Sequence, residues 1–98
     1  SSAELVISAL KPYIGNSNVI TVGSATHGKP VGMSGRIDGS IYYFLVNFYV
    51  RNNIDETTSF YGIPATCNAE DDLSHSMGDT NEAMLSTALY YISHNACP

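Results

Sequence analysis

The chain begins with SSAELVISAL, residues 1–10, and its second informative stretch is THGKP, residues 26–30. In the first stretch two serines precede apolar residues at helical spacing, which predicts a helix with a serine at its N-cap. In the second stretch Lys29 lies in a glycine-proline turn that follows a strand-like run. A serine at a helix start and a lysine on a neighbouring turn are the minimal parts of a Ser-Lys hydrolase, in which a neutral amine takes the hydroxyl proton.

Length and composition set the outer limits of the interpretation. The 98 residues allow one domain at most, and 44% hydrophobic against 13% charged residues excludes the disordered class. The formal net charge of -5 argues against nucleic acid as a partner, because phosphate binding needs a basic face. No apolar run approaches the roughly 18 residues of a membrane helix, so we expect no transmembrane segment.

The first half of the chain reads as a helix followed by a short strand. The pattern predicts a helix over residues 2–10, with Glu4 in the first turn where the helix dipole favours a carboxylate. Pro12 is expected to end or kink this helix. A turn over residues 15–18 and a β-branched strand over residues 19–22 should follow.

The middle of the chain predicts a β-hairpin. Residues 32–37 and 40–51 look like strands, closed by Asp38-Gly39, which is typical of a type I′ turn. The second strand is an apolar and aromatic run, so we expect it to be buried on both faces.

The last part reads as a loop and a terminal helix. Residues 52–72 should be mostly extended loop. Asp79 and Glu82 form an Asp-x-x-Glu box before an apolar series, which predicts a final helix over residues 80–94.

The two cysteines, Cys67 and Cys97, leave two alternatives open. In an exported protein they would pair and join the penultimate residue to the loop before the last helix. Two reduced, partly buried thiols are the other interpretation. They lack the ligand count of a metal site, and no metal or cofactor is expected.

The ordered set of motifs resembles the carboxyl-terminal processing (tail-specific) proteases, particularly the envelope type of Bacteroidetes. The family has a small-residue nucleophile run, a strand ending in glycine, a Gly-Lys turn and an acidic lead-in to a terminal helix. The corresponding stretches here are SSAELVI (1–7), VITVG (19–23), THGKPVG (26–32) and DDLSHSMGD (71–79). The resemblance covers essentially all 98 residues and implies the C-terminal part of a protease, beginning at the nucleophile.

The resemblance assigns roles to three residues. Ser1 takes the nucleophile position, Lys29 the general-base position, and the backbone N–H of Ser2 contributes to the oxyanion hole. A lysine serves as a base only when desolvation lowers its pKa well below the ordinary value near 10.4. His27 stands where relatives carry an aromatic residue, and Met33 stands where some relatives place a third catalytic residue, a glutamine.

The resemblance also implies fold, activity and location. We expect residues 1–98 to be a single domain of α/β class, a crotonase-like fragment with helices packed on a small sheet. The implied activity is a serine endopeptidase that cleaves protein or peptide substrates by acyl transfer. Relatives place this activity in the periplasm, the cell envelope or outside the cell.

Other interpretations remain open beside the Ser-Lys dyad. Related modules in the retinoid-binding protein of the photoreceptor matrix carry apolar ligands, so a non-catalytic module that binds an apolar ligand or a peptide is the alternative function. A weaker option uses the α-amine of Ser1 as the base. His75, beside Asp71 and Asp72, suggests a metal site or a Ser-His-Asp arrangement with Ser74 or Ser76, but we favour a structural role for this loop histidine.

Overall fold

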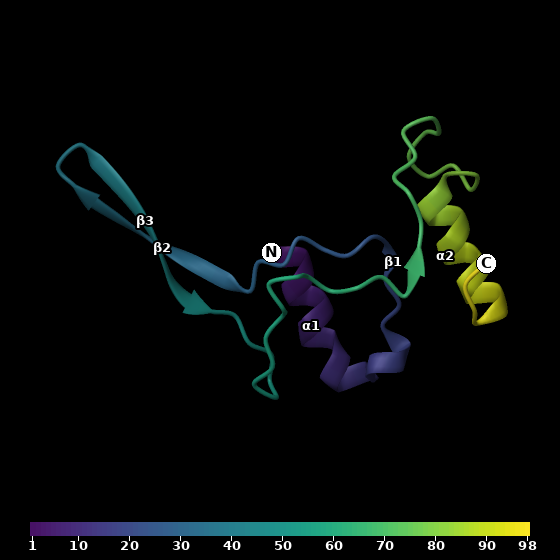
Figure 1. Cartoon of the computed structure of the whole chain (residues 1–98), viewed down its shortest axis with the longest axis horizontal. Coiled ribbons are helices and arrows are strands. Elements are labelled where there is room, and N and C mark those ends of the chain that lie inside the picture. Colours follow the sequence, from purple (N-terminus) through teal and green to yellow (C-terminus); the bar gives the residue numbers. More distant parts are fainter. The chain divides into compact units, whose positions relative to one another are not determined.

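The computed structural model describes all 98 residues, and these divide into two compact units (Figure 1). The first unit comprises Ser1–Val19 and His27–Ile63, and the second comprises Ile20–Thr26 and Pro64–Pro98. Each unit contains one α-helix and one two-stranded sheet. The mixture of helices and small sheets is compatible with the predicted α/β class.

Helix α1, Ser2–Ile14, begins where the sequence predicts but runs past Pro12. Of the two predicted effects of this proline, an end or a kink, the end of the helix at Pro12 is wrong. Proline has no N–H for the carbonyl four residues earlier, and it normally leaves that carbonyl without a partner. Here Asn52 Nδ2 donates to Ser8 O at 3.2 Å, so a distant side chain replaces the missing donor. The helix ends at Gly15, which has a φ of 89°, and a short 3₁₀ turn, Asn16–Asn18, follows.

Strands β2, Val31–Asp38, and β3, Ile41–Tyr49, form the predicted antiparallel hairpin. The register runs from Val31 opposite Tyr49 to Asp38 opposite Ile41, with an irregularity between Gly32 and Met33. Gly39 and Ser40 form the loop, and of the two only Gly39 has a positive φ, 59°. A type I′ turn needs positive φ at both positions, so that prediction is wrong, and a glycine in first place fits type II′.

The expectation that the aromatic strand is buried on both faces is also wrong, because every residue of β3 is exposed. The sheet has two strands only, and α1, the helix of the same unit, does not lie over a face of it (Figure 1). Residues opposite each other in the register share a face. One face is therefore apolar throughout, and it comprises Met33, Gly35, Ile37, Tyr42, Phe44 and Val46.

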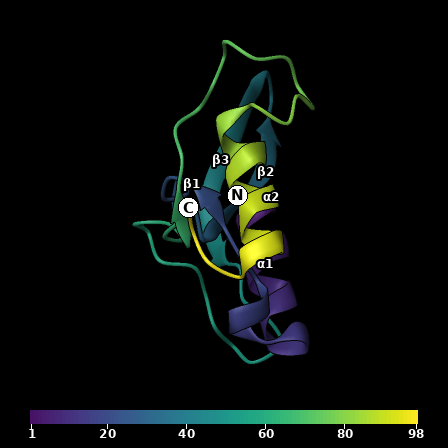
Figure 2. The same ribbon diagram turned by 90° about the vertical axis from the view of Figure 1, so that its right-hand side faces the viewer.

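The second unit is built on a short parallel pair of strands. Strand β1, Val22–Gly23, pairs with β4, Cys67–Asn68, and α2 lies beside them (Figure 2). The predicted strand over residues 19–22 is thus shorter and later than expected, and β4 was not predicted. Hydrogen bonds from Thr66 N and Cys67 N to Thr21 O, 2.8 and 3.0 Å, extend the pairing by one position.

Helix α2, Ala83–His94, ends at the predicted residue but begins three residues later than predicted. Its N-cap is Glu82, whose carboxylate accepts hydrogen bonds from Met84 N and Leu85 N. The Asp79 carboxylate instead accepts from Asn81 N at 2.9 Å and stabilises a separate turn. Asn95, with a φ of 53°, terminates the helix.

Apolar burial is slight in both units. Ile63 in the first unit and Cys67 in the second are the only buried hydrophobic residues, 8% and 2% exposed. The largest fully buried side chains are Glu4 and Cys67. A carboxylate and a half-cystine thus occupy the positions that aliphatic side chains fill in most small domains.

Candidate active site

Ser1 lies at the head of α1 as its N-cap. Its Oγ accepts a hydrogen bond from Glu4 N at 3.4 Å, and the Glu4 carboxylate accepts one from Ser1 N at 2.7 Å. This reciprocal pair is a capping box, which satisfies two backbone donors of the helix start. The Ser1 residue is exposed, so its hydroxyl is accessible to a substrate.

The Glu4 carboxylate also binds the loop that carries Lys29. Gly28 N donates to Oε1 at 2.6 Å, and Lys29 N donates to Oε2 at 3.1 Å. Glu4 is only 1% exposed, so these bonds form away from water, where hydrogen bonds are strong. The carboxylate therefore holds residues 28 and 29 against the first turn of α1.

Lys29 approaches Ser1 through its backbone. The terminal ammonium of Ser1 donates to Lys29 O at 2.7 Å, and the two residues lie side by side although 28 positions separate them. The Lys29 side chain is exposed and takes part in none of the ion pairs. No hydrogen bond joins the Ser1 hydroxyl to the Lys29 ammonium, so the catalytic dyad stays a prediction.

Ser1 and Lys29 line the same open depression, of about 240 Å³. One wall is polar and is formed by the first residues of α1. The other wall is apolar and is formed at the open end of the hairpin, where β2 begins and β3 ends. The lining residues are Ser1, Ser2, Leu5, Lys29, Val31, Gly32, Phe48 and Val50. A depression with a hydroxyl, an amine and an apolar wall can accept a peptide backbone with an aliphatic side chain.

Ser2, the predicted oxyanion residue, is the first residue of α1. The N–H groups of a first helical turn have no acceptor within the helix, and the positive end of the helix dipole lies there. The Ser2 N–H can therefore stabilise a developing oxyanion beside Ser1.

The Asp72–Ser74–His75 cluster lies in the second unit and has the geometry of a turn. His75 Nδ1 lies 2.7 Å from Asp72 Oδ2 and 3.1 Å from Ser74 Oγ. In a catalytic triad the serine and the carboxylate use different ring nitrogens, whereas here both contact Nδ1. This geometry favours the structural interpretation of His75.

The carboxylate of Asp72 is the strongest acceptor of this turn. Ser74 Oγ donates to it at 2.6 Å and Ser74 N at 3.0 Å. The Ser74 hydroxyl, followed by His75 and the Ser74 amide, lowers the pKa of Asp72 from 3.8 to about 2. These interactions favour the ionised carboxylate and so stabilise the turn at neutral pH.

The other two histidines make no contact with the Ser1 hydroxyl among the hydrogen bonds of the structure. His27 is exposed, next to Gly28. His94 Nδ1 lies 3.0 Å from Tyr90 O in the last turn of α2, and its ring stacks on Tyr90 with centroids 4.0 Å apart. The position of His94 at the helix C-terminus agrees with a favourable dipole interaction.

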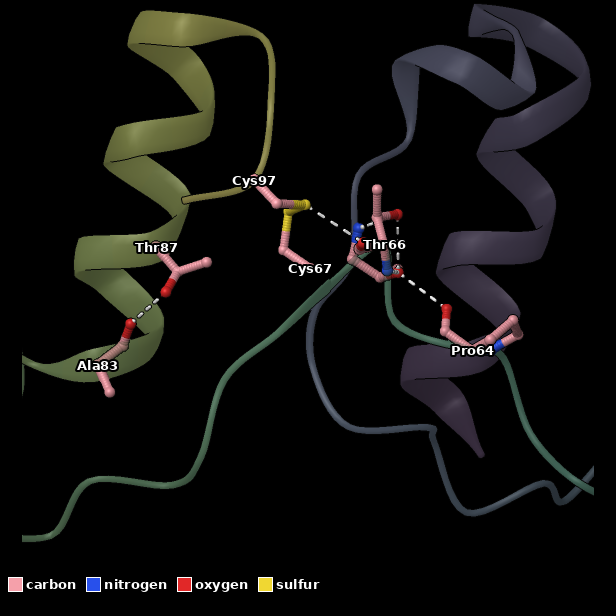
Figure 3. The surroundings of a disulfide bond; sticks show 7 residues. Pro64, Thr66, Cys67, Ala83, Thr87 and Cys97 are labelled. Carbon is pink, nitrogen blue, oxygen red and sulfur yellow. Dashed lines mark hydrogen bonds between the residues drawn. A yellow bond between two sulfur atoms is a disulfide. The ribbon is translucent and has the colours of Figure 1, made fainter.

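Cys67 and Cys97 are paired, which decides between the two alternatives left open by the sequence (Figure 3). Their Cα atoms are 5.5 Å apart, and the bond joins the residues that follow α2 to strand β4. Cys97 Sγ lies 3.3 Å from Thr66 O, and Thr87 Oγ1 donates to Ala83 O within α2 (Figure 3). Disulfides persist in oxidising compartments, so the pairing is relevant to the kind of compartment in which the protein folds.

Two roles were missed at the sequence level. Glu4 was interpreted only as a residue of the helix start, and Asn52 was placed in a loop without a function. The Ser1-x-x-Glu4 spacing indicates a capping box, but it does not indicate that Glu4 also binds the Gly28 N–H. Pro12, two residues after the predicted helix, is the one available signal for a side-chain donor such as Asn52.

Three general findings complete the description. No group of three or more His, Cys, Asp or Glu side chains is arranged to hold a metal ion. Neither helix has the length and apolar character needed to cross a membrane. No protein-family model, curated protein or solved structure matches this chain.

Proposed function

We propose that the chain is the C-terminal part of a serine endopeptidase of the carboxyl-terminal processing type, with a crotonase-like fold. The observation that carries the proposal is the attachment of the Lys29 loop to the Ser1 helix start through Glu4, with bonds of 2.6 and 3.1 Å. The motif order of the sequence suggested these two residues, and they line one depression.

In the proposed reaction the Ser1 hydroxyl attacks the scissile carbonyl carbon. Its proton passes to the neutral Lys29 amine as the Oγ–C bond forms, and the Ser2 N–H stabilises the resulting oxyanion. Collapse of the intermediate breaks the C–N bond, and Lys29 returns the proton to the leaving amine. Water then hydrolyses the acyl-enzyme, with Lys29 as base.

Two properties support the view that this activity needs further protein around the chain. A lysine acts as a base when it is shielded from water, whereas Lys29 is exposed here. The hairpin presents an apolar face that water alone covers in this chain. Additional chain over these surfaces would bury both and complete the oxyanion hole and the substrate-binding strands.

The disulfide supports a periplasmic, envelope or extracellular location, because thiols are kept reduced in the cytosol. Protein or peptide segments are the proposed substrates.

The second candidate is a non-catalytic module that binds an apolar ligand or a peptide. The exposure of Lys29 and the apolar wall formed by Val31, Phe48 and Val50 favour it. In that case Lys29 would contribute charge to binding and no proton transfer.

Peptide cleavage by the isolated 98 residues and by the full-length protein that contains them tests the proposal. We expect negligible cleavage by the isolated chain, since loss of one oxyanion donor alone costs on the order of 100- to 1000-fold. The full-length protein should cleave and should lose activity with Ser1→Ala and with Lys29→Ala. Lys11→Ala, a lysine of α1, is the control. Robust turnover by the isolated chain, or an active Lys29→Ala protein, would contradict the mechanism.

A further inference from the structure

Glu4 makes more contacts than a helix cap requires. A glutamate at this position of a capping box binds the N-cap nitrogen, here Ser1 N at 2.7 Å. Two additional bonds, to Gly28 N at 2.6 Å and Lys29 N at 3.1 Å, reach a loop 24 and 25 positions away. Burial of a carboxylate to 1% exposure is unfavourable unless such donors surround it.

The loop is also held from its other side. Gly28 has a φ of 85° and is buried, and a Cβ there would overlap Phe60 O and lie 2.6 Å from Gly62 N. The backbone at residue 28 is therefore enclosed between the Glu4 carboxylate and the segment around Phe60. This enclosure determines where the Lys29 backbone lies, and Lys29 lines the depression together with Ser1.

We propose that Glu4 is a positioning residue that sets the separation of Ser1 and Lys29; this inference rests on the proposed peptidase function. Its carboxylate belongs to the first turn of α1, which begins beside Ser1, and accepts from Gly28 N at 2.6 Å and Lys29 N at 3.1 Å; the Ser1 nitrogen that it also binds, at 2.7 Å, is here a terminal ammonium. It does not contact the substrate. By holding the nucleophile and the base to one rigid acceptor, it limits the geometries that the two side chains can adopt relative to each other.

Glu4→Gln tests the contact itself in the 98-residue chain. Glutamine keeps the size of the side chain but turns one acceptor into an NH₂ donor, which faces the donors of the loop. We expect amide hydrogen exchange at Gly28 and Lys29 to accelerate at least about tenfold, with the amides between β2 and β3 unchanged. Unchanged exchange at Gly28 and Lys29 would overturn the proposal.

Glu82→Gln is the matched control, because Glu82 is the other carboxylate that caps a helix in this chain. It binds Met84 N and Leu85 N at 3.0 and 2.8 Å within its own helix start. Exchange at those two amides should accelerate, and exchange at Gly28 and Lys29 should not change. An equal effect of both variants on the Lys29 loop would show general loosening and overturn a specific role for Glu4.

Kinetics of the full-length protein test the consequence of the contact. With concentrations set by active-site titration with a serine-reactive phosphonate, Glu4→Gln should lower kcat about 10- to 100-fold and change KM less than about twofold. A kcat within twofold of the unaltered protein would overturn the positioning role. If Lys29→Ala keeps full activity, the peptidase function itself fails, and the positioning role fails with it. The exchange measurement then still reports whether Glu4 holds the loop.

Glu4→Asp decides the case if Glu4→Gln unfolds the chain. Aspartate keeps the negative charge at the helix start, but it is one methylene shorter and does not reach the loop. We expect accelerated exchange at Gly28 and Lys29 and lowered kcat with an intact hairpin. Normal exchange and normal kcat in Glu4→Asp would overturn the inference.

Discussion

In the first unit a buried carboxylate joins two distant backbone segments, whereas in the second unit a disulfide does so. Glu4 connects α1 to residues 28 and 29 through hydrogen bonds of 2.6 to 3.1 Å. Cys67 and Cys97 connect β4 to the residues after α2 by a covalent bond across 30 positions. The Glu4 and Cys67 side chains are almost inaccessible to water, whereas Cys97 is exposed, and neither unit has a substantial aliphatic core.

The hydrogen bonds and the disulfide stabilise the protein in different ways. A hydrogen bond contributes about 0.5–1.5 kcal/mol net, or about 1.5–3 kcal/mol to a charged group, but its geometry is directional. A disulfide acts mainly by restricting the unfolded chain, and it leaves local geometry to other contacts. The connection in the first unit therefore constrains the geometry of the backbone at residues 28 and 29, whereas the connection in the second unit mainly adds stability.

Loss of the disulfide should have the largest effect on stability. For a loop of 30 residues the chain-entropy model gives about 3.6 kcal/mol, so Cys67→Ser with Cys97→Ser should destabilise the second unit by about 3–4 kcal/mol. Amide exchange in α2, read residue by residue, measures this change. The Gly28 and Lys29 amides of the first unit should keep their protection. A loss below about 1 kcal/mol in α2 would show that hydrogen bonds and packing alone hold the second unit.

Removal of the Asn52 side chain should have an intermediate effect, confined to the first unit. Asn52→Ala removes the donor to Ser8 O and the acceptor of Ile54 N and Glu56 N, which should cost about 1–2 kcal/mol in the free energy of unfolding. Denaturant titration measures it.

Pro12→Ala sharpens this second test, because it restores an N–H that can serve Ser8 O. In the Pro12→Ala background the cost of Asn52→Ala should therefore be smaller than in the unaltered chain. Equal costs in the two backgrounds would show that Asn52 does not compensate for the proline.

The smallest effect concerns the Asp72 turn and its response to pH. The pKa of Asp72 is lowered from 3.8 to about 2 by the Ser74 hydroxyl first and His75 next. A carboxyl whose pKa is lower in the folded state stabilises the fold above pH 3.8, and that contribution disappears as the pH falls through about 2. Carbon-13 NMR titration of the carboxyl should give the low value, and Ser74→Ala should raise it toward 3.8. An unchanged titration in Ser74→Ala would assign the shift to another group.

Local features of the fold followed from the sequence, with errors of up to four residues at the boundaries. Ser1 as N-cap, the antiparallel hairpin and the end of α2 at His94 agree with the structure. The start of α2 was misplaced because two acidic residues, Asp79 and Glu82, both suit a helix start. Only the observed turn at Asp79 shows that Glu82 is the cap.

The sequence predicted which residues belong to the candidate site but not how they are arranged in space. The motif order indicated Ser1, Ser2 and Lys29, and the structure places Ser1 and Lys29 in backbone contact at 2.7 Å. The connection through Glu4 was not predictable, because a capping box has the same sequence pattern with or without a loop against it. The exposed aromatic strand was mispredicted because apolar composition indicates a tendency to be buried and does not supply the surface that buries it.

By itself the sequence determined the elements whose causes lie within a few residues: helix caps, the glycine-containing hairpin turn and the spacing of apolar positions. Only the tertiary structure decided that α1 continues through Pro12, that β1 pairs with β4, that the cysteines join, and that Glu4 binds the Lys29 loop. These features link residues separated by 24 to 45 positions, through single side chains or through a short run of backbone hydrogen bonds. The physical reason that the sequence did not predict them is that a distant donor, acceptor or thiol reaches its partner only after the chain has folded. No periodic pattern in the sequence indicates which distant residues will come into contact.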